Sequence, residues 1–222
     1  MKLYAQNVGF NATLNTYRAK QVIKFAKGKT CLEIGCGSGQ ITKYLVKYFK
    51  EVSVIDMESK HINNLPKYKN ILSKQIGKFE DSHFYETYDY IVCTNIVEHI
   101  EHLDLFFKAL KSVCNSRTII FISVPNAKSY NRQLGVELGM LKDYLNLGKQ
   151  DKAVGHKKMF TPSVLEFDLK LSEFKILKIG TMIYKPFPNS MMNKLPKSII
   201  NKCLNYKMKD NGAEIYVVCK IK

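Results

Sequence analysis

Three glycines at alternate positions, Gly35, Gly37 and Gly39, form the first feature of the chain that could do chemistry. They follow a short apolar run that ends in Glu33, and they precede a stretch, 40–49, whose apolar residues recur at helical spacing. Glycine accepts positive φ angles and lets a ligand approach the bare backbone. A helix start adds unpaired N–H groups and the positive end of the helix dipole. This strand, turn and helix predict a site for a nucleotide-like or carboxylate-bearing ligand.

A carboxylate that could hold a ribose stands at the end of the next apolar run, 51–55. This residue is Asp56. It lies about 20 residues beyond the glycine turn, at the spacing where an acid accepts hydrogen bonds from ribose hydroxyls. Asp56 also precedes a short helical stretch, 57–65, so it could instead act as the N-cap of that helix. The glycine turn favours the ribose contact.

A third short strand, 69–75, is followed by two residues that could recognise a nucleotide base. Phe79 and Glu80 fall where an adenine ring could be stacked and its amino group could be hydrogen-bonded. An ordinary solvated loop is the alternative for this segment. Phe79 and Glu80 are therefore candidates for adenine contact, with a solvated loop as the alternative.

Alternating strands and helices must position these residues. We expect further strands at 88–93, 117–124, 174–179 and 214–221, with helices at 13–26 and 104–114. In the helix at 104–114, we expect Leu105, Phe106, Leu110 and Val113 to lie on one side. The alternation predicts an α/β, doubly wound sheet with helices on both faces.

Two segments interrupt this alternation. The first, at about 127–155, contains several glycines, so we expect short broken helices there. A long insertion after the fifth strand is a natural place for a substrate lid, and an extra packing helix is the alternative. The second insertion, at about 186–212, holds a basic amphipathic stretch, 194–209. That stretch could lie on an anionic membrane or pack on the domain with its lysines outward.

Length and composition predict one globular domain over residues 1–222. The chain can bury a large core, and its hydrophobic fraction of 45% argues against disorder. No apolar run is long enough to span a membrane, and the first residues lack a signal-peptide apolar region. The six cysteines contain no C-x-x-C pair. We therefore expect a reduced, cytoplasmic protein that could lie peripherally on the inner membrane.

The chain carries a large excess of positive charge. It has 35 Lys and Arg against 19 Asp and Glu, a formal net charge of +16. Such a field attracts anions, which fits a phosphorylated substrate, nucleic acid or an anionic membrane. Abundant Lys with scarce Arg and no Trp is also the composition of an AT-rich genome. The charge therefore admits an anionic partner without requiring one.

Three segments together resemble class I S-adenosylmethionine-dependent methyltransferases. The first is E-x-G-x-G-x-G at 33–39, the second is D-Y-I-V-C-T-N-I-V-E-H-I at 89–100, and the third is T-I-I-F-I-S-V-P-N at 118–126. The later segment from His156 through Phe160 and Thr161 is similar to small-molecule members such as ubiquinone and sugar O-methyltransferases. The resemblance implies a mostly parallel, seven-stranded, Rossmann-like sheet whose last strand is antiparallel, with helical lid insertions.

The resemblance also implies roles for residues along the carboxyl ends of the strands. The methionine part of S-adenosylmethionine would lie against the glycine turn, the ribose on Asp56, the adenine near 78–80, and the sulfonium side over the fourth strand. The cofactor-binding residues implied are Glu33, Gly35, Gly37, Gly39, Asp56, Met57, Lys78, Phe79, Glu80, Asn95 and Ile96. The two insertions have no secure counterpart in the family, so the choice of acceptor does not follow from it.

Methyl transfer needs orientation and desolvation, and a hydroxyl acceptor also benefits from a base. His99, just past the fourth strand, and His156, just past the first insertion, are the candidate catalytic residues. A structural role for His99 is the alternative. Glu98 is expected to face away from the site. No paired carboxylates suggest a metal site, so we expect none.

These observations predict methyl transfer to a polar small molecule that is anionic or phosphorylated. A hydroxyl of a sugar, nucleotide-sugar or cell-envelope precursor is the first expectation. A membrane-associated quinone or lipid methyltransferase, an RNA methyltransferase and a non-catalytic cofactor-binding module are the alternatives. Nucleic acid is the less favoured partner, and no N-P-P-Y segment follows the fourth strand. The sequence does not determine the oligomeric state.

Overall fold

Seven strands form one sheet in the computed structural model, which describes residues 9–206 and 210–222. The strand order is β3-β2-β1-β4-β5-β7-β6. Their bounds are β1 Thr30–Ile34, β2 Glu51–Asp56, β3 Ile71–Ile76, β4 Tyr88–Thr94, β5 Cys114–Pro125, β6 Phe174–Met182 and β7 Glu214–Ile221. Strands β1 to β5 are parallel to one another, and β7 runs antiparallel to both β5 and β6. The expected mostly parallel, seven-stranded sheet is confirmed.

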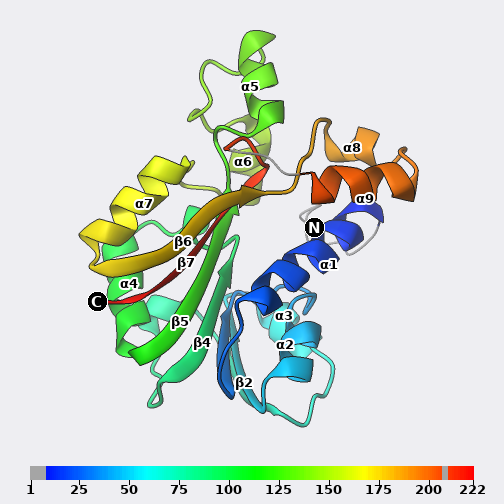
Figure 1. Cartoon of the computed structure of the whole chain (residues 1–222). Helices are drawn as coiled ribbons and strands as arrows, with labels where there is room; N and C mark the ends of the chain where they lie inside the picture. Colours follow the sequence, from blue (N-terminus) through cyan, green and yellow to red (C-terminus); the bar gives the residue numbers. More distant parts are fainter. Residues whose placement is uncertain (1–8, 207–209) are drawn as a thin grey trace.

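Helices cover both faces of the sheet (Figure 1). One face carries α1 Gly9–Lys24, α2 Thr42–Tyr48 and α3 Ser59–Asn63, and the other carries α4 Leu103–Ser112 and α7 Pro162–Leu171. Each face has its own hydrophobic core, because the central strands are buried on both sides. Such strands read as continuous apolar runs, which is why β4 and β5 could be located in the sequence.

The helices differ from the expected ranges at their ends and in one inward face. α1 begins at Gly9, four residues earlier than expected, and α4 ends before Cys114, which begins β5. On α4, Leu105 does not belong to the buried side: it is 51% exposed, whereas Phe107 is buried. The expected inward position of Leu105 was wrong because the helix is rotated so that Phe106, Phe107 and Leu110 face the sheet.

Short helices occupy both insertions, and the glycines of the first insertion predicted them there. The first contains α5 Tyr130–Glu137 and α6 Lys149–Val154, and the second contains α8 Asn189–Met192 and α9 Lys197–Asn205. α5 projects beyond the edge of the sheet, and α8 and α9 lie beside the start of α1 (Figure 1).

The two insertions are joined where they leave the sheet. The buried amide of Asn126 donates to the carbonyls of Asp210 and Gly212, at 2.9 and 2.8 Å. The backbone N–H of Tyr130 donates to Asn211 O at 3.0 Å. These bonds fix the root of the first insertion against the end of the second.

The basic stretch packs on the domain through its apolar side. Ile200 and Leu204 of α9 are buried in a third core cluster with Phe10 and Leu14 of α1. Lys194, Lys197 and Lys202 are exposed, whereas Lys207 and Lys209 lie outside the described residues. Two of the apolar side chains that a bilayer would need are therefore already covered.

The sequence leaves two uses open for the N-terminal aromatic residues Tyr4 and Phe10, to fold over a cofactor or to pack on the domain. Phe10 lies buried in the third core cluster, where α1 packs against the second insertion, so this ring has the packing role. Tyr4 lies outside the described residues.

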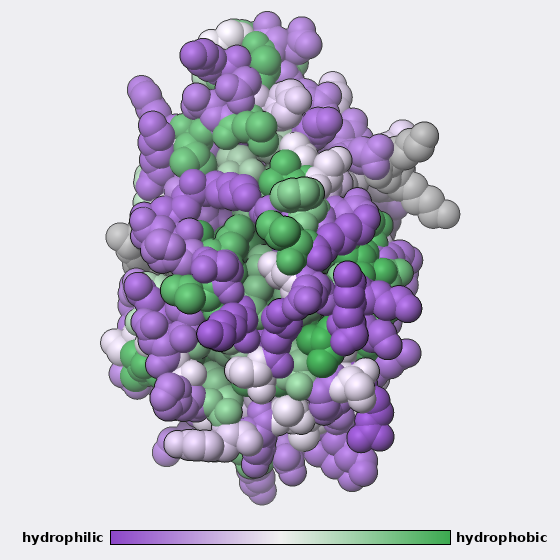
Figure 2. All heavy atoms as spheres, turned by 90° about the vertical axis from the view of Figure 1, so that its left-hand side faces the viewer, coloured by the Kyte–Doolittle hydropathy of each residue, from purple (hydrophilic) through white to green (hydrophobic). Residues whose placement is uncertain are grey.

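Figure 2 shows the side of the molecule on which α4 and α7 lie. Hydrophilic side chains cover most of it, and apolar side chains form small separate areas. Scattered apolar residues are ordinary on a protein surface. Among the described residues, no helix has the length and apolar character that crossing a membrane requires.

Leu105 and Leu110 of α4 give a matched test of the helix's orientation. Leu110→Ala removes a fully buried side chain and should lower the free energy of unfolding by about 2–5 kcal/mol. Leu105→Ala removes a side chain that is 51% exposed and should change it by less than about 1 kcal/mol. Urea unfolding followed by circular dichroism measures both. Equal losses from the two variants would contradict this orientation of α4.

Candidate active site

The glycine turn has the backbone geometry that the sequence predicts. Gly35, Gly37 and Gly39 all have positive φ angles, of 80°, 52° and 73°. A side chain added at Gly35 would meet Ile96 Cδ1 at 2.0 Å, whereas one added at Gly37 would meet no atom within 4 Å. Gly35 is therefore required by close packing. Gly37 leaves open space beside the backbone, where a ligand can approach.

Glu33 lies beneath this turn. Its side chain is buried and accepts a hydrogen bond of 2.6 Å from the hydroxyl of Thr42, at the start of α2. Burial raises the pKa of Glu33 to about 8, against the opposing effect of the Thr42 hydrogen bond. Glu33 therefore holds the turn to α2, and its contribution to a ligand would come through that support.

Asp56 joins the glycine turn to the end of β2. Its Oδ2 accepts the backbone N–H of Gly37 at 2.8 Å, and its Oδ1 accepts the N–H of Glu58 at 2.9 Å. His61 Nδ1 lies 3.0 Å from the same Oδ1. The N-cap of α3 is Glu58, so the alternative of Asp56 as that cap was wrong. The carboxylate stands at the turn, where a ribose could reach it.

The expected adenine edge is only partly presented at the surface. Met57 is 65% exposed directly after Asp56. Lys78 is exposed just before the short 3-10 helix η2 Phe79–Asp81, and Glu80, within this helix, is partly exposed. The ring of Phe79 is buried against Phe84 and Phe106, so the expectation that it stacks on adenine was wrong. Apolar burial made its aromatic ring a core residue.

The end of β4 has a special backbone conformation. Asn95 has a φ angle of 55°, which is uncommon for a residue other than glycine. Its N–H donates to Ser123 O of β5 at 2.8 Å. Ile96 follows and packs against Gly35. Asn95 and Ile96 thus lie beside the glycine turn, on the rim where the resemblance places them.

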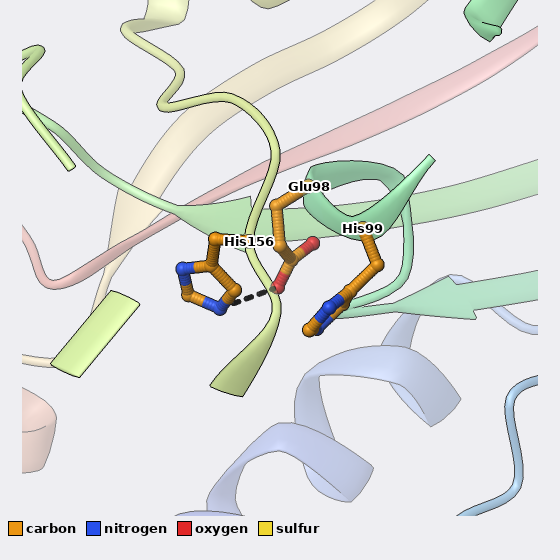
Figure 3. A group of neighbouring side chains, drawn as sticks. All are labelled: Glu98, His99 and His156. Atoms are coloured by element: carbon orange, nitrogen blue, oxygen red, sulfur yellow. Dashed lines mark ion pairs between the residues drawn. The ribbon is translucent and has the colours of Figure 1, made fainter. Parts of the chain in front are cut away.

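Glu98, His99 and His156 come together beside this rim (Figure 3). Glu98 and His99 belong to the 3-10 helix η3 Val97–His99, and His156 follows the first insertion. The two imidazole centroids are 4.9 Å apart, and His156 Nε2 lies 4.0 Å from Glu98 Oε1. The two candidate catalytic histidines are therefore neighbours. Glu98 was expected to face away, and the structure corrects this.

The burial of Glu98 is unfavourable for the stability of the fold. It is 1% exposed, and neither carboxylate oxygen has a hydrogen-bond partner among the described residues. Burial, and secondarily the charge of Glu214, raise its pKa to about 8. A buried polar group without a partner is unfavourable, and such groups concentrate at functional sites.

The first insertion fixes the orientation of His156. Asp151 Oδ1 lies 3.4 Å from His156 Nδ1, and Asp151 Oδ2 accepts a hydrogen bond of 2.8 Å from Arg132 of α5. Burial opposes ionisation of Asp151, but its contacts with His156 and Arg132 lower the pKa to about 2. The ionised Asp151 carboxylate faces Nδ1 without a hydrogen bond, since the buried Nδ1 has no hydrogen-bond partner among the described residues, and Nε2 lies on the side of Glu98.

The same cluster has the donor set of a cation site. Glu98, His99 and His156 each offer a ligand atom, and these atoms lie within 4.8 Å of one another. Two imidazoles and one carboxylate suit a transition metal or zinc. His99 Nδ1 lies 3.2 Å from Gly155 O and His156 Nδ1 faces Asp151, the outer contacts that metal-binding histidines commonly have.

Sequence reasoning missed the residues that depend on tertiary contacts. His61, Glu98, Asp151 and Arg132 were not predicted to act at the site. The adjacent Glu98-His99 pair was visible, but the orientation of a 3-10 helix does not follow from its sequence. Asp151 lies five residues before His156 in a segment with broken helical pattern, which gave no periodic signal.

The chain matches known methyltransferases by sequence. A family model described as "Methyltransferase domain" matches residues 10–179. Ubiquinone biosynthesis O-methyltransferases from Mus musculus and Bos taurus are 26% and 27% identical, over 72% and 78% of this chain and 45% and 49% of theirs. A (S)-tetrahydroprotoberberine N-methyltransferase from Eschscholzia californica is 27% identical over 47% of this chain and 32% of its own. The chain spans about half the length of the first two relatives.

Solved structures share the fold over almost the whole chain. A SAM-dependent methyltransferase from Thermotoga maritima superposes with a TM-score of 0.71 at 12% identity, covering 96% of this chain and 91% of that one. A glycopeptide N-methyltransferase complexed with S-adenosylmethionine gives 0.60 at 11%, covering 93% and 87%. The chain therefore belongs to the methyltransferase-domain family, and its fold is that of the class I S-adenosylmethionine-dependent enzymes.

Proposed function

We propose that this protein transfers a methyl group from S-adenosylmethionine to a hydroxyl of a polar, anionic small molecule. The observation that carries the proposal is the joining of two features at one edge of the sheet. The open glycine turn with Asp56 suits a nucleoside, and the Glu98-His99-His156 cluster suits a base. Both lie at the carboxyl ends of parallel strands, where α/β sheets bind their ligands.

The cofactor would be held by residues of three strand ends. The methionine part would lie along Gly35, Gly37 and Gly39, and Asp56 would accept hydrogen bonds from the ribose hydroxyls. Met57 offers an exposed apolar side chain to the adenine, and Glu80 offers an acceptor to its amino group. When bound, the cofactor supplies an electrophilic methyl group on a positively charged sulfur. Asn95 and Ile96 would face that sulfur.

The histidine cluster favours a hydroxyl acceptor. A hydroxyl becomes a much better nucleophile when a base removes its proton as the new O–C bond forms, whereas a neutral amine already carries a nucleophilic lone pair. His156 would accept this proton at Nε2, because the ionised Asp151 lies 3.4 Å from the other ring nitrogen and favours a proton there. Burial raises the pKa of Glu98 to about 8, and the imidazolium cation formed 4.0 Å away would favour the ionised form of this carboxyl group.

The chemical class of the acceptor is a separate part of the proposal. The net charge of +16 supports an anionic compound, and the curated relatives include O- and N-methyltransferases. Hydroxylated aromatic acids are first to be tested beside sugar nucleotides, because ubiquinone biosynthesis O-methyltransferases match 72% and 78% of the chain. A panel assay for released S-adenosylhomocysteine identifies the acceptor.

Replacing Asp56 tests the cofactor site. Asp56→Ala should weaken the binding of S-adenosylhomocysteine by about tenfold or more, because hydrogen bonds to an ionised carboxylate are strong. Isothermal titration calorimetry measures the dissociation constant. Glu58→Ala is the matched control, since that acid is two residues away and exposed. Equal dissociation constants for Asp56→Ala and the unaltered protein would disprove the ribose contact.

Replacing His156, and Asp151 beside it, tests the role of His156 as the general base. His156→Gln should lower kcat by about 10²- to 10⁴-fold, the usual contribution of a general base. Binding of S-adenosylhomocysteine should stay within about twofold, because His156 contacts the acceptor side only. Asp151→Asn should lower kcat less and shift the pH–rate profile, since it acts through His156. An unchanged kcat in His156→Gln would remove His156 from the reaction.

Chelation distinguishes a base from a bound cation at the same cluster. A base that acts alone keeps its rate after dialysis against EDTA, measured with the acceptor that gives turnover. Loss of activity, with recovery on adding zinc or manganese, would instead assign Glu98, His99 and His156 to a metal site. The apoprotein's affinity for S-adenosylhomocysteine, measured by calorimetry, should be the same in both cases.

A further inference from the structure

A second group of charged residues lies on the same edge of the sheet, between β6, β7 and α1. Lys185 follows the end of β6, three residues after Met182, which pairs with Glu214 at the start of β7. On the other side, Glu214 pairs with Pro125, the last residue of β5. Because β6 is antiparallel to β7 and β7 to β5, the end of β6 lies at the edge where β5 ends. Lys185 therefore stands on the catalytic rim.

The carboxylate of Glu214 is already engaged by Arg18. Arg18 Nε lies 2.8 Å from Glu214 Oε1 and 3.0 Å from Oε2, and an Nη2 contact completes a bidentate pair. Both side chains are largely buried. A bidentate guanidinium–carboxylate pair uses the acceptor capacity of both oxygens. Glu214 thus neutralises Arg18.

Lys185 has only a neutral partner. Its Nζ donates to Asn189 Oδ1 at 3.1 Å, and Asn189 in turn donates to Asn11 Oδ1 at 2.8 Å. Among residues 9–206 and 210–222, no carboxylate lies within ion-pair distance of Lys185. Burial lowers the pKa of Lys185, against the opposing charge of Glu214, and the charge of Arg18 adds a smaller lowering. Glu214 is thus the nearby carboxylate for both cations, and its hydrogen bonds go to Arg18.

This charged group lies within electrostatic reach of Glu98, the neighbour of the candidate base His156. The charges of Glu214 and Arg18 both influence the pKa of Glu98, so the two groups of residues share one electrostatic environment. A cation withdrawn from water is unfavourable unless an anion pairs with it. Lys185 follows β6, on the side of β4 that also holds β5 and β7. Asp56 and the glycine turn lie at the ends of β2 and β1, on the other side of β4.

We propose that Lys185 is the anion-recognition residue of the methyl-acceptor site. Its ammonium group would pair with a carboxylate or phosphate of the acceptor, while the acceptor's hydroxyl faces His156. The inference rests on the proposed function, and it adds the group through which an anionic acceptor is selected. Asn189 acts as a positioning residue, because its amide holds the ammonium group on the rim.

An anion-binding test needs no knowledge of the acceptor. The full chain, labelled with ¹³Cε-lysine and saturated with S-adenosylhomocysteine, is titrated with inorganic phosphate and observed by NMR. The Lys185 signal, assigned by its loss in Lys185→Met, should shift and reach saturation, whereas that of the exposed Lys175 on β6 should not. Equal, unsaturated shifts at both lysines would overturn the proposal. Binding of S-adenosylhomocysteine in the same sample shows that the cofactor site is intact.

Matched compounds test the same residue during turnover. The panel contains pairs that differ only in the anion, such as 3,4-dihydroxybenzoate and its methyl ester, or glucose 6-phosphate and glucose. For the anionic acceptor, Lys185→Met should raise KM about tenfold or more with a smaller change in kcat, and Lys175→Met should leave both unchanged. An unchanged KM in Lys185→Met, or a preference for the neutral member of the pair, would overturn the proposal. Comparison of the carboxylate pair with the phosphate pair shows which of the two anions the site selects.

Discussion

The hydrogen bond from the Gly37 N–H to Asp56 Oδ2 connects the two parts of the structure on which the site depends. One part is a backbone bend whose three positive φ angles favour glycine, and the other is a carboxylate at the end of the neighbouring parallel strand. Parallel pairing forces these ends to the same edge of the sheet. The rest of the fold, with a core on each face, holds that edge in place.

The rim keeps charged groups where they are unfavourable for stability. Glu33 and Glu98 are buried carboxyl groups with raised pKa values, and Lys185 is a cation without a carboxylate partner among the described residues. Only Glu33 has a clear structural use, because Thr42 binds it. Glu98 follows β4 and Lys185 follows β6, at the edge of the sheet where we propose that the acceptor binds. Groups of this kind are retained when a ligand or a reaction needs them.

Much of the architecture was predictable because it follows from local patterns. Buried strands gave continuous apolar runs. The alternate glycines, Gly35 and Gly37 among them, predicted a turn with positive φ angles, which the structure has. Side-chain direction was not predictable in the same way. Phe79 joined the core, and Glu98 turned inward, because packing of short 3-10 helices decided both. The Asp151–His156 contact depends on how an insertion folds back, which no periodicity encodes.

A crystal structure of the chain grown with S-adenosylhomocysteine tests the central claim most directly. The account predicts density for the nucleoside along the glycine turn, with ribose hydroxyls about 3 Å from Asp56 and the sulfur facing Asn95. To accept them, Asp56 would exchange its contact with His61, since two oxygens cannot serve every donor at once. A nucleoside bound elsewhere, or an Asp56 that keeps all its present partners without touching the ribose, would contradict the account.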